Sequence, residues 1–129
     1  MSKPGGDGRE RRLRARAFGI RGEWAALAWL LVRGYRVLAR NYRMSNGEID
    51  LIAARRGVIA FVEVKSRPQI DAARTAITFE KRRRISRAVT HWLMRNTWAV
   101  GYTLRGDAIF IAPRKWPEHV ENVFELDLL

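Results

Sequence analysis

The pattern of apolar and polar residues changes its period along the chain, and each change marks a predicted element. From Ala17 to Arg33 the sequence is rich in Ala, Leu and Trp, which indicates a helix that is apolar on most sides. Gly34 follows as a stop signal for this helix. Residues 1–16 hold three Gly, one Pro and five Arg, so they predict a flexible basic arm, for which a helical end is also open. We therefore expect a single folded domain over residues 17–129.

Three strands are predicted next, joined by two short turns. The segments 35–43, 48–54 and 58–66 alternate apolar and polar residues or carry short runs rich in Val and Ile. The turns between them are Ser45-Asn46-Gly47, in which Asn-Gly tolerates the positive φ angles of tight hairpins, and Arg55-Arg56-Gly57. Strands connected in this way form an antiparallel meander.

A second helix and a fourth strand are predicted in the C-terminal half. Residues 79–96 place Ile85 and Trp92 on one apolar stripe at helical spacing, and residues 102–112 have the pattern of a strand. The tail, 120–129, fits either a short strand or a docked helix. The order helix, three-strand meander, helix, strand predicts an α/β fold, with a mixed sheet and flanking helices.

Composition adds a strongly basic charge to this small domain. The 129 residues include 25 Lys and Arg against 13 Asp and Glu, a formal net charge of +12, which favours a polyanionic partner such as nucleic acid. The absence of Cys excludes disulfides, zinc-thiolate sites and thiol catalysis. No apolar run is long enough to span a membrane, and no signal-peptide core is present. We expect a cytoplasmic protein that does not bind a membrane.

Two carboxylates in apolar strands are the candidate chemistry. Asp50 lies between Ile49 and Leu51, which strand alternation places on the opposite face, and Glu63 lies in a similar apolar frame. Counting back from the second turn brings Asp50 opposite Glu63 or close to it. Two buried carboxylates repel each other, and a hard divalent cation, Mg²⁺ or Mn²⁺, would compensate their charge. Lys65 shares the face of Glu63 and is expected to project into the same pocket.

The motif Glu63-Val64-Lys65 has an ordinary interpretation too. Glu-x-Lys on a strand, taken alone, is usually a solvated face or a local ion pair. The combination of Asp50, a short turn and this motif, inside a domain of charge +12, favours a catalytic site instead.

At these residues the chain resembles a known family. Gly47–Ile52 and Phe61–Arg67 are similar to the signature of the YraN-like family of small bacterial proteins. More distantly they resemble archaeal Holliday-junction resolvases and the restriction-endonuclease-like fold with its PD-(D/E)xK site. The resemblance covers roughly Gly19–Ala112. Further matching positions are Gly22-Glu23, Gly34-Tyr35, Arg40–Arg43, Lys81 and Asp107.

The resemblance implies a restriction-endonuclease-like fold and a Mg²⁺-dependent endonuclease that hydrolyses phosphodiester bonds in DNA. Asp50 and Glu63 would bind the metal, with the backbone carbonyl of Val64 as a third ligand. Lys65 would orient or activate the attacking water, or stabilise charge in the transition state. Glu23 would complete the acidic cluster or hold a metal-bound water. The likeness to resolvases implies branched or structured DNA as the substrate and a homodimer.

Basic residues beside the strands and on the second helix are predicted to contact phosphates. They are Arg43, Arg67, Lys81, Arg82, Arg83, Arg84 and Arg87. The alternative function is a non-catalytic nucleic-acid-binding module that uses this basic helix and the arm. Nothing in the sequence separates DNA from RNA, so an RNA-processing role also stays open.

Overall fold

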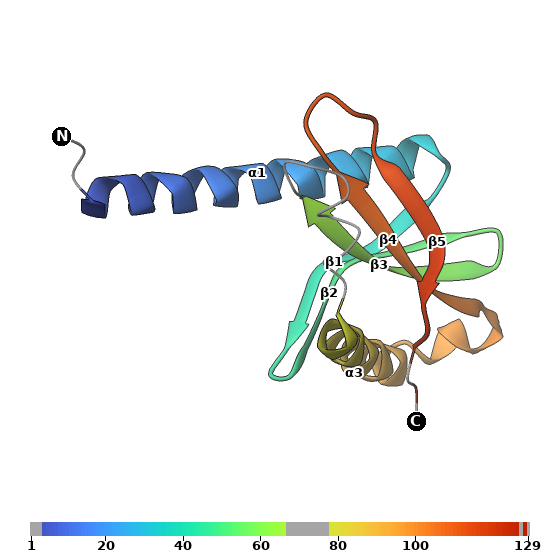
Figure 1. Cartoon of the computed structure of the whole chain (residues 1–129). Helices are drawn as coiled ribbons and strands as arrows, with labels where there is room; N and C mark the ends of the chain where they lie inside the picture. The colour runs from blue at the N-terminus through green and yellow to red at the C-terminus, as the bar shows by residue number, and fades with distance from the viewer. Residues whose placement is uncertain (1–3, 67–77, 127, 129) are drawn as a thin grey trace.

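The chain folds around one five-stranded sheet that carries a helix on each face (Figure 1). The computed structural model describes residues 4–66, 78–126 and 128. In these residues no helix combines the length and the apolar character that crossing a membrane requires. The elements are α1 (Pro4–Val32), β1 (Arg36–Met44), β2 (Gly47–Arg55), β3 (Val58–Ser66), α3 (Phe79–Arg95), the 3-10 helix η1 (Thr97–Gly101), β4 (Thr103–Ile111) and β5 (Glu118–Phe124).

The sheet is mixed, with strand order β1-β2-β3-β4-β5. The first three strands form the predicted antiparallel meander, β3 and β4 run parallel with α3 in the connection between them, and β5 is antiparallel to β4. The prediction of an α/β fold with a mixed sheet and flanking helices is confirmed, and the arrangement is compatible with a restriction-endonuclease-like fold. The C-terminal segment, for which strand and helix were both open, contributes the edge strand β5.

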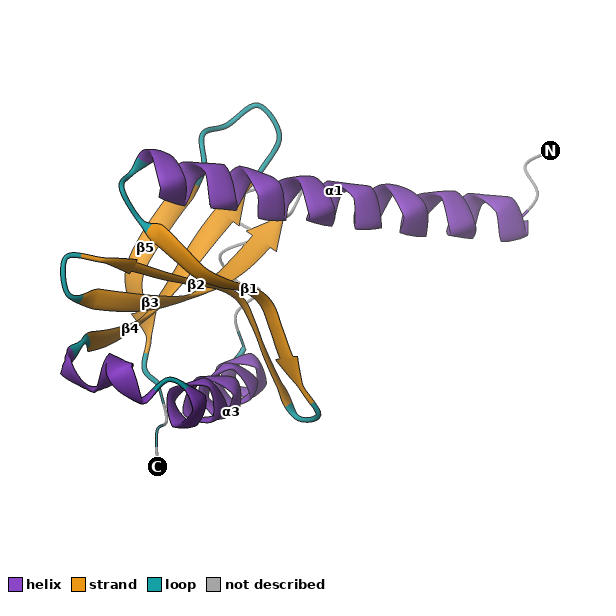
Figure 2. Cartoon of the chain, turned by 180° about the vertical axis from the view of Figure 1, so that it is seen from behind, coloured by secondary structure: helices purple, strands orange, loops and turns teal. Residues whose placement is uncertain are grey.

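Both faces of the central strands are covered, as their apolar sequences require (Figure 2). On one face Phe61 of β3 packs against Trp92 of α3, with the two ring centroids 5.7 Å apart. On the other face Val62, the next residue of β3, packs in a separate core with Ala26 and Leu30 of α1. Successive β3 residues therefore serve two different cores, and β3 is fixed between the two helices.

Helix α1 is longer than the sequence predicted. It begins at Pro4 instead of Ala17, so residues 4–16, the described part of the predicted flexible arm, lie in the helix. Residues 9–16 consist only of Arg, Glu, Leu and Ala, which are good helix formers and explain this part of the extension. The N-terminal half of α1 projects beyond the sheet (Figure 1). The boundary of the folded domain at residue 17 stays a prediction.

The two predicted turns form for different reasons. In the second turn Arg56 and Gly57 have φ angles of 49° and 78°, the left-handed conformation that a two-residue hairpin needs. Gly47 in the first hairpin has no positive φ, so the conformational reason predicted for it is wrong. A Cβ on Gly47 would lie 2.5 Å from the carbonyl oxygen of Arg84 and 3.0 Å from the amide nitrogen of Ala88. Glycine is needed here because the hairpin contacts the backbone of α3.

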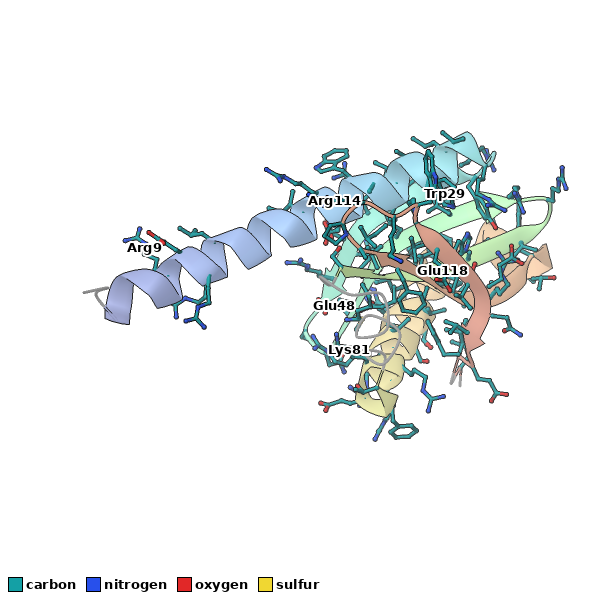
Figure 3. All side chains as sticks on the ribbon, turned by 45° about the horizontal axis from the view of Figure 1, so that its top comes forward. Arg9, Trp29, Glu48, Lys81, Arg114 and Glu118 are labelled. Atoms are coloured by element: carbon teal, nitrogen blue, oxygen red, sulfur yellow. The ribbon has the colours of Figure 1, made fainter. Side chains whose placement is uncertain are left out.

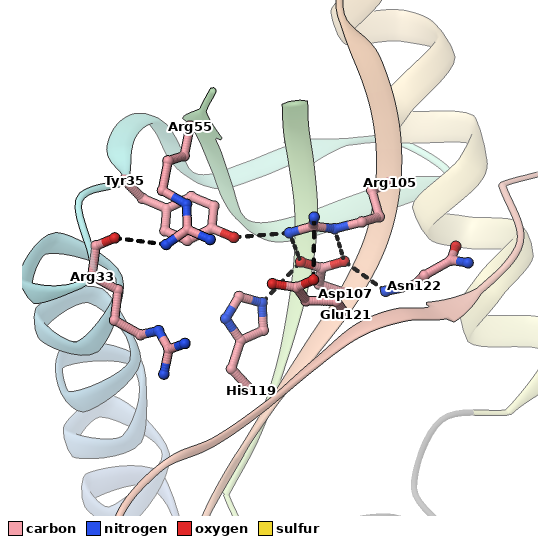
Figure 4. Close-up of polar contacts among 8 residues, drawn as sticks. All are labelled: Arg33, Tyr35, Arg55, Arg105, Asp107, His119, Glu121 and Asn122. Atoms are coloured by element: carbon pink, nitrogen blue, oxygen red, sulfur yellow. Dashed lines mark hydrogen bonds and ion pairs between the residues drawn. The ribbon is translucent and has the colours of Figure 1, made fainter. Parts of the chain in front are cut away.

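A buried ionic cluster joins β4, β5 and Tyr35, the residue that precedes β1 (Figure 4). Asp107 is fully buried, and its two carboxylate oxygens accept hydrogen bonds of 2.8 Å from Nε and Nη2 of Arg105. His119 Nε2 lies 2.8 Å from the same carboxylate, and the Asn122 amide donates to it at 2.9 Å. Arg105 also donates to the Tyr35 hydroxyl at 2.8 Å. Burial acts to raise the pKa of Asp107, but the hydrogen bonds from His119 and Arg105 outweigh it and lower the pKa.

We predict that Asp107→Asn lowers the free energy of unfolding by about 3–5 kcal/mol, because it leaves the Arg105 guanidinium without its buried counter-charge. The lowered pKa of Asp107 means that this stabilisation is present above its ordinary pKa of 3.8 and is lost as the pH falls through the folded value. Urea unfolding at neutral and at acid pH measures both effects.

The matched control is Glu121→Gln, which removes a half-exposed carboxylate 3.5 Å from Nη1 of the same arginine. Its expected cost is below about 1 kcal/mol because solvent screens the pair. Equal losses in the two variants would contradict a special role for the buried carboxylate.

Candidate active site

Strands β2 and β3 part at Asp50. Their pairing runs up to Leu51↔Val62, and Asp50 is the next residue of β2. Instead of a backbone group, the Oδ2 atom of Asp50 accepts the hydrogen bond from the Val64 amide, at 2.8 Å. A carboxylate thus replaces a carbonyl as the partner of β3, and the register brings Asp50 beside Glu63 as predicted.

The strand on the other side of Asp50 is irregular at the same level. Asn41 of β1, which falls opposite Asp50 in the register, has a φ angle of 49°. Within β2 the alternation also breaks, because Ile49 packs with Ile52 in the core under α3, whereas Leu51 packs under α1. The predicted placement of Ile49 and Leu51 on one face is therefore wrong. The strand changes direction where it leaves β3, as strands often do beside functional sites.

Glu63 and Lys65 form a buried ion pair on the α3 side of the sheet. Lys65 Nζ lies 2.8 Å from Glu63 Oε1, and the two side chains are only 6% and 10% exposed. Lys81, from the first turn of α3, places its Nζ 3.9 Å from the same oxygen. Glu63 and Lys65, predicted to share a pocket, are thus together, and Lys81, predicted to contact phosphates, joins them from 16 positions further along the chain than Lys65.

Glu48 is a fourth member of this region that the sequence analysis did not include. It lines a small cleft together with Glu63, Lys81 and Arg84, and Glu48 and Lys81 lie near each other on the ribbon (Figure 3). Its Oε1 atom is 3.7 Å from Arg84 Nη2. The signal was present in the sequence, because Glu48 lies two residues before Asp50 on the same strand.

Burial and a neighbouring charge raise the pKa of Asp50 to about 8. Removal from solvent is the largest cause, the negative charge of Glu63 is the second, and the Val64 amide only partly opposes them. At neutral pH the Asp50 carboxyl therefore favours its protonated form. A cation bound beside Asp50 would favour the ionised form instead.

Helix α1 brings Glu23 toward the same carboxylates. A Cβ on the preceding residue, Gly22, would lie 1.7 Å from Ser66 Oγ, so the helix backbone touches the end of β3 here. The charge of Glu23 contributes to the raised pKa of Asp50, as the smallest of its causes. Glu23 is thus within electrostatic reach of Asp50.

The acidic residues do not form a complete metal cage. Within the described ranges, no three His, Cys, Asp or Glu side chains are arranged so that they could hold a metal ion. A backbone carbonyl and solvent would have to complete a cation's shell around Asp50 and Glu63. The N–H and C=O of a strand residue point to the same edge, so the Val64 carbonyl faces the side from which Asp50 approaches.

The other predicted phosphate contacts spread over α3 and the first hairpin. Arg84 contacts Glu48, and Arg87 donates to the Asn46 carbonyl at 3.4 Å. The guanidinium groups of Arg82 and Arg83 lie over the ring of Phe79, at 5.4 and 5.9 Å from its centroid. Arg43 is an exposed residue 4.0 Å from Glu48, and Arg67 lies outside the described residues.

We predict that Asp50→Asn stabilises the metal-free protein at alkaline pH. A folded pKa of about 8 against an ordinary value of 3.8 means that the protonated acid is favoured on folding. The protonated Asp50 carboxyl therefore adds to the free energy of unfolding. This stabilisation is fully present below pH 3.8 and is lost as the pH rises through about 8. In chelator at about pH 9 the variant should melt at least roughly 4 °C above the wild type, and the gap should close near pH 4.

Calorimetry of both proteins across this pH range measures the gap. Glu80→Gln, which removes an exposed carboxylate in the first turn of α3, is the matched control and should melt like the wild type throughout. A gap between Asp50→Asn and the wild type that does not change with pH would show that Asp50 does not titrate as inferred.

Comparison with known proteins identifies the family to which the chain belongs. The sequence model of the uncharacterised protein family UPF0102 matches residues 22–111, which include Glu23, Asp50, Glu63 and Lys65. A UPF0102 protein of Methylobacterium nodulans is 52% identical over 117 residues, covering 88% of this chain and 91% of the relative. One from Methylorubrum extorquens is 50% identical, over 97% of this chain and 98% of its own. The chain therefore belongs to the UPF0102 family, which confirms the predicted resemblance to YraN-like proteins.

Proposed function

We propose that the protein is a metal-dependent nuclease that hydrolyses phosphodiester bonds in DNA. The observation that carries the proposal is the meeting of Asp50, Glu63 and Lys65 where β2 and β3 part, with both side chains of the Glu63–Lys65 pair buried. A partly buried acid with a strongly raised pKa, next to a second acid and a lysine, is costly to the fold and is typical of a catalytic site.

Mg²⁺ or Mn²⁺ is the cofactor that suits these residues. Asp50 and Glu63 offer hard oxygen donors, which these ions prefer, and the pair lacks a counter-charge of its own at Asp50. The two carboxylates would hold the ion, and the Val64 carbonyl would be the third protein ligand. When bound, the ion supplies Lewis-acid activation of the phosphate and of water.

The remaining residues act on the water and the phosphate. Lys65, held 2.8 Å from Glu63, orients the attacking water or neutralises the charge that builds on the phosphate oxygens. Lys81 and Arg84 bind the non-bridging oxygens of the same or the adjoining phosphate. Glu23 accepts a hydrogen bond from a water at the edge of the site. The water oxygen attacks phosphorus, one P–O bond breaks, and the leaving oxygen takes up a proton.

A non-catalytic nucleic-acid-binding module is the competing function. It would use the arginines of α3, but it would gain nothing from a buried Glu63–Lys65 pair beside Asp50. This cost favours the nuclease. Branched DNA as the substrate and a homodimer stay predictions of the resemblance to resolvases.

Cleavage assays test the nuclease directly. We predict metal-dependent cutting in a panel of four-way-junction, flap, single-stranded and linear duplex DNA, incubated with and without Mg²⁺ or Mn²⁺. Asp50→Asn and Glu63→Gln should each lower the rate by at least about 10³-fold, and Lys65→Met by about 10²–10³-fold, since each removes charge from the reacting centre.

Glu80→Gln, purified in the same way, controls for loss of a carboxylate and for traces of a host nuclease. It should cut like the wild type because Glu80 is exposed and outside the site. DNA binding without cutting under either metal would leave the binding module as the function.

Binding by α3 predicts a distinct salt dependence. Arg84→Gln should weaken binding of any DNA sequence and reduce the slope of log Kd against log salt by about one. Arg95→Gln, at the other end of the same helix, is the control and should leave the slope unchanged. Titrations at several salt concentrations in chelator measure the slope; an equal change in both variants would argue against a localised contact.

A further inference from the structure

A groove outside the acidic site runs between the first hairpin and α3. Its volume is about 440 Å³, within the range of small-ligand sites. We call it the hairpin groove; the residues that define it are Met44, Asn46, Arg83, Arg87, His91 and Met94. No Asp or Glu is among its described lining residues, and the proposed phosphodiester chemistry makes no use of it.

The walls of the hairpin groove suit an aromatic ring. Met44 from β1 and Met94 from the last turns of α3 contribute thioethers, which make favourable contacts with aromatic rings. The imidazole of His91 is held in place, because the Tyr42 hydroxyl hydrogen bonds to its Nδ1 atom. A fixed imidazole can stack on a base. The apolar character of the walls therefore favours a planar ligand such as a nucleobase.

The rim of the hairpin groove suits a phosphate. Arg83 and Arg87 are exposed and lie one helical turn apart on the same face of α3. Within residues 4–66 and 78–126, the guanidinium of Arg83 lies over the ring of Phe79, that of Arg87 donates to the carbonyl of Asn46, and neither partner is an acid. Their positive charge is thus available to an anion. An aromatic ring and an anion next to it together describe a nucleotide.

Successive residues of α3 line the hairpin groove and the cleft of the candidate active site, with Arg83 in the groove. Arg84, which follows Arg83, lines the cleft that contains Glu63 and Lys81. Gly47 lets the hairpin lie against the α3 backbone at Arg84 and Ala88. This contact between the hairpin and α3 positions both the hairpin groove and the cleft. A strand with a phosphate at Lys81 and Arg84 therefore has a neighbouring nucleotide close to the groove.

We propose that the hairpin groove binds one unpaired nucleotide of the substrate strand, so that the protein selects DNA with unpaired bases near the scissile bond. The proposal rests on the proposed nuclease function and adds its substrate class. A base in a continuous duplex is stacked and paired, and both interactions must be broken to remove it, whereas an unpaired base enters at little cost. Selectivity follows from this difference.

Binding in chelator tests the groove without any need for cleavage. The probes are a fluorescent duplex of about 20 base pairs and the same duplex with a bulge of unpaired thymines. Wild-type protein should bind the bulged probe about tenfold more tightly, because an unpaired base can stack in the groove. Met94→Glu, at a position that is 74% exposed, should bring the ratio of the two dissociation constants close to one.

Two further variants separate the groove from charge alone. Val100→Glu makes the same charge change at an 87% exposed apolar residue outside the groove, and Met94→Leu keeps the apolar wall. Both should retain the preference. Equal affinity of wild-type protein for the two probes, or equal loss of preference in Met94→Glu and Val100→Glu, would overturn the proposal.

The failures of the two proposals are distinguishable. If no DNA is cut but the preference for the bulged probe and its loss in Met94→Glu are observed, the groove stands and the nuclease falls. If metal-dependent cutting is observed with no preference for unpaired bases, the nuclease stands and the groove falls.

Discussion

The hydrogen bond from the Val64 amide to Asp50 is the contact on which the candidate site depends. It ends the pairing of β2 with β3, and it holds a carboxylate at the point where the two strands separate. The Glu63–Lys65 pair begins at the next residue of β3 after the last paired one, Val62. The fold supports the interruption from both faces, with Leu30 and Ala26 of α1 on one side and α3 on the other.

The sequence predicted the central register of the sheet because that register follows from local rules. A two-residue turn at Arg56-Gly57 fixes which residues of β2 and β3 are opposite, and strand alternation then places Asp50 beside Glu63. The same rules fail at Ile49, because the change of direction in β2 is set by packing against α3 and not by local sequence. Gly47 shows this as well: its pattern indicates a turn, but its structural role is contact with a helix about 40 residues away.

The contacts that the sequence could not predict are those that depend on β5. The tail was open between strand and helix, so nothing placed His119 or Asn122 beside Asp107. Asp107 matched the family pattern, but its partners became visible only with the pairing of β4 and β5, which is itself irregular between Gly106 and Ala108. Long-range polar clusters of this kind are set by topology, and topology has no short-range signal.

Two aspartates of the same sheet, Asp107 fully buried and Asp50 partly buried, differ in the groups that surround their carboxylates. Asp107 accepts hydrogen bonds from Arg105, His119 and Asn122, and its pKa is lowered. Asp50 accepts one amide and faces the charge of Glu63, and its pKa is raised to about 8. The first arrangement stabilises the fold as it stands. The second destabilises it at neutral pH, and a site that keeps such a cost is more simply explained by a ligand that removes it than by folding alone.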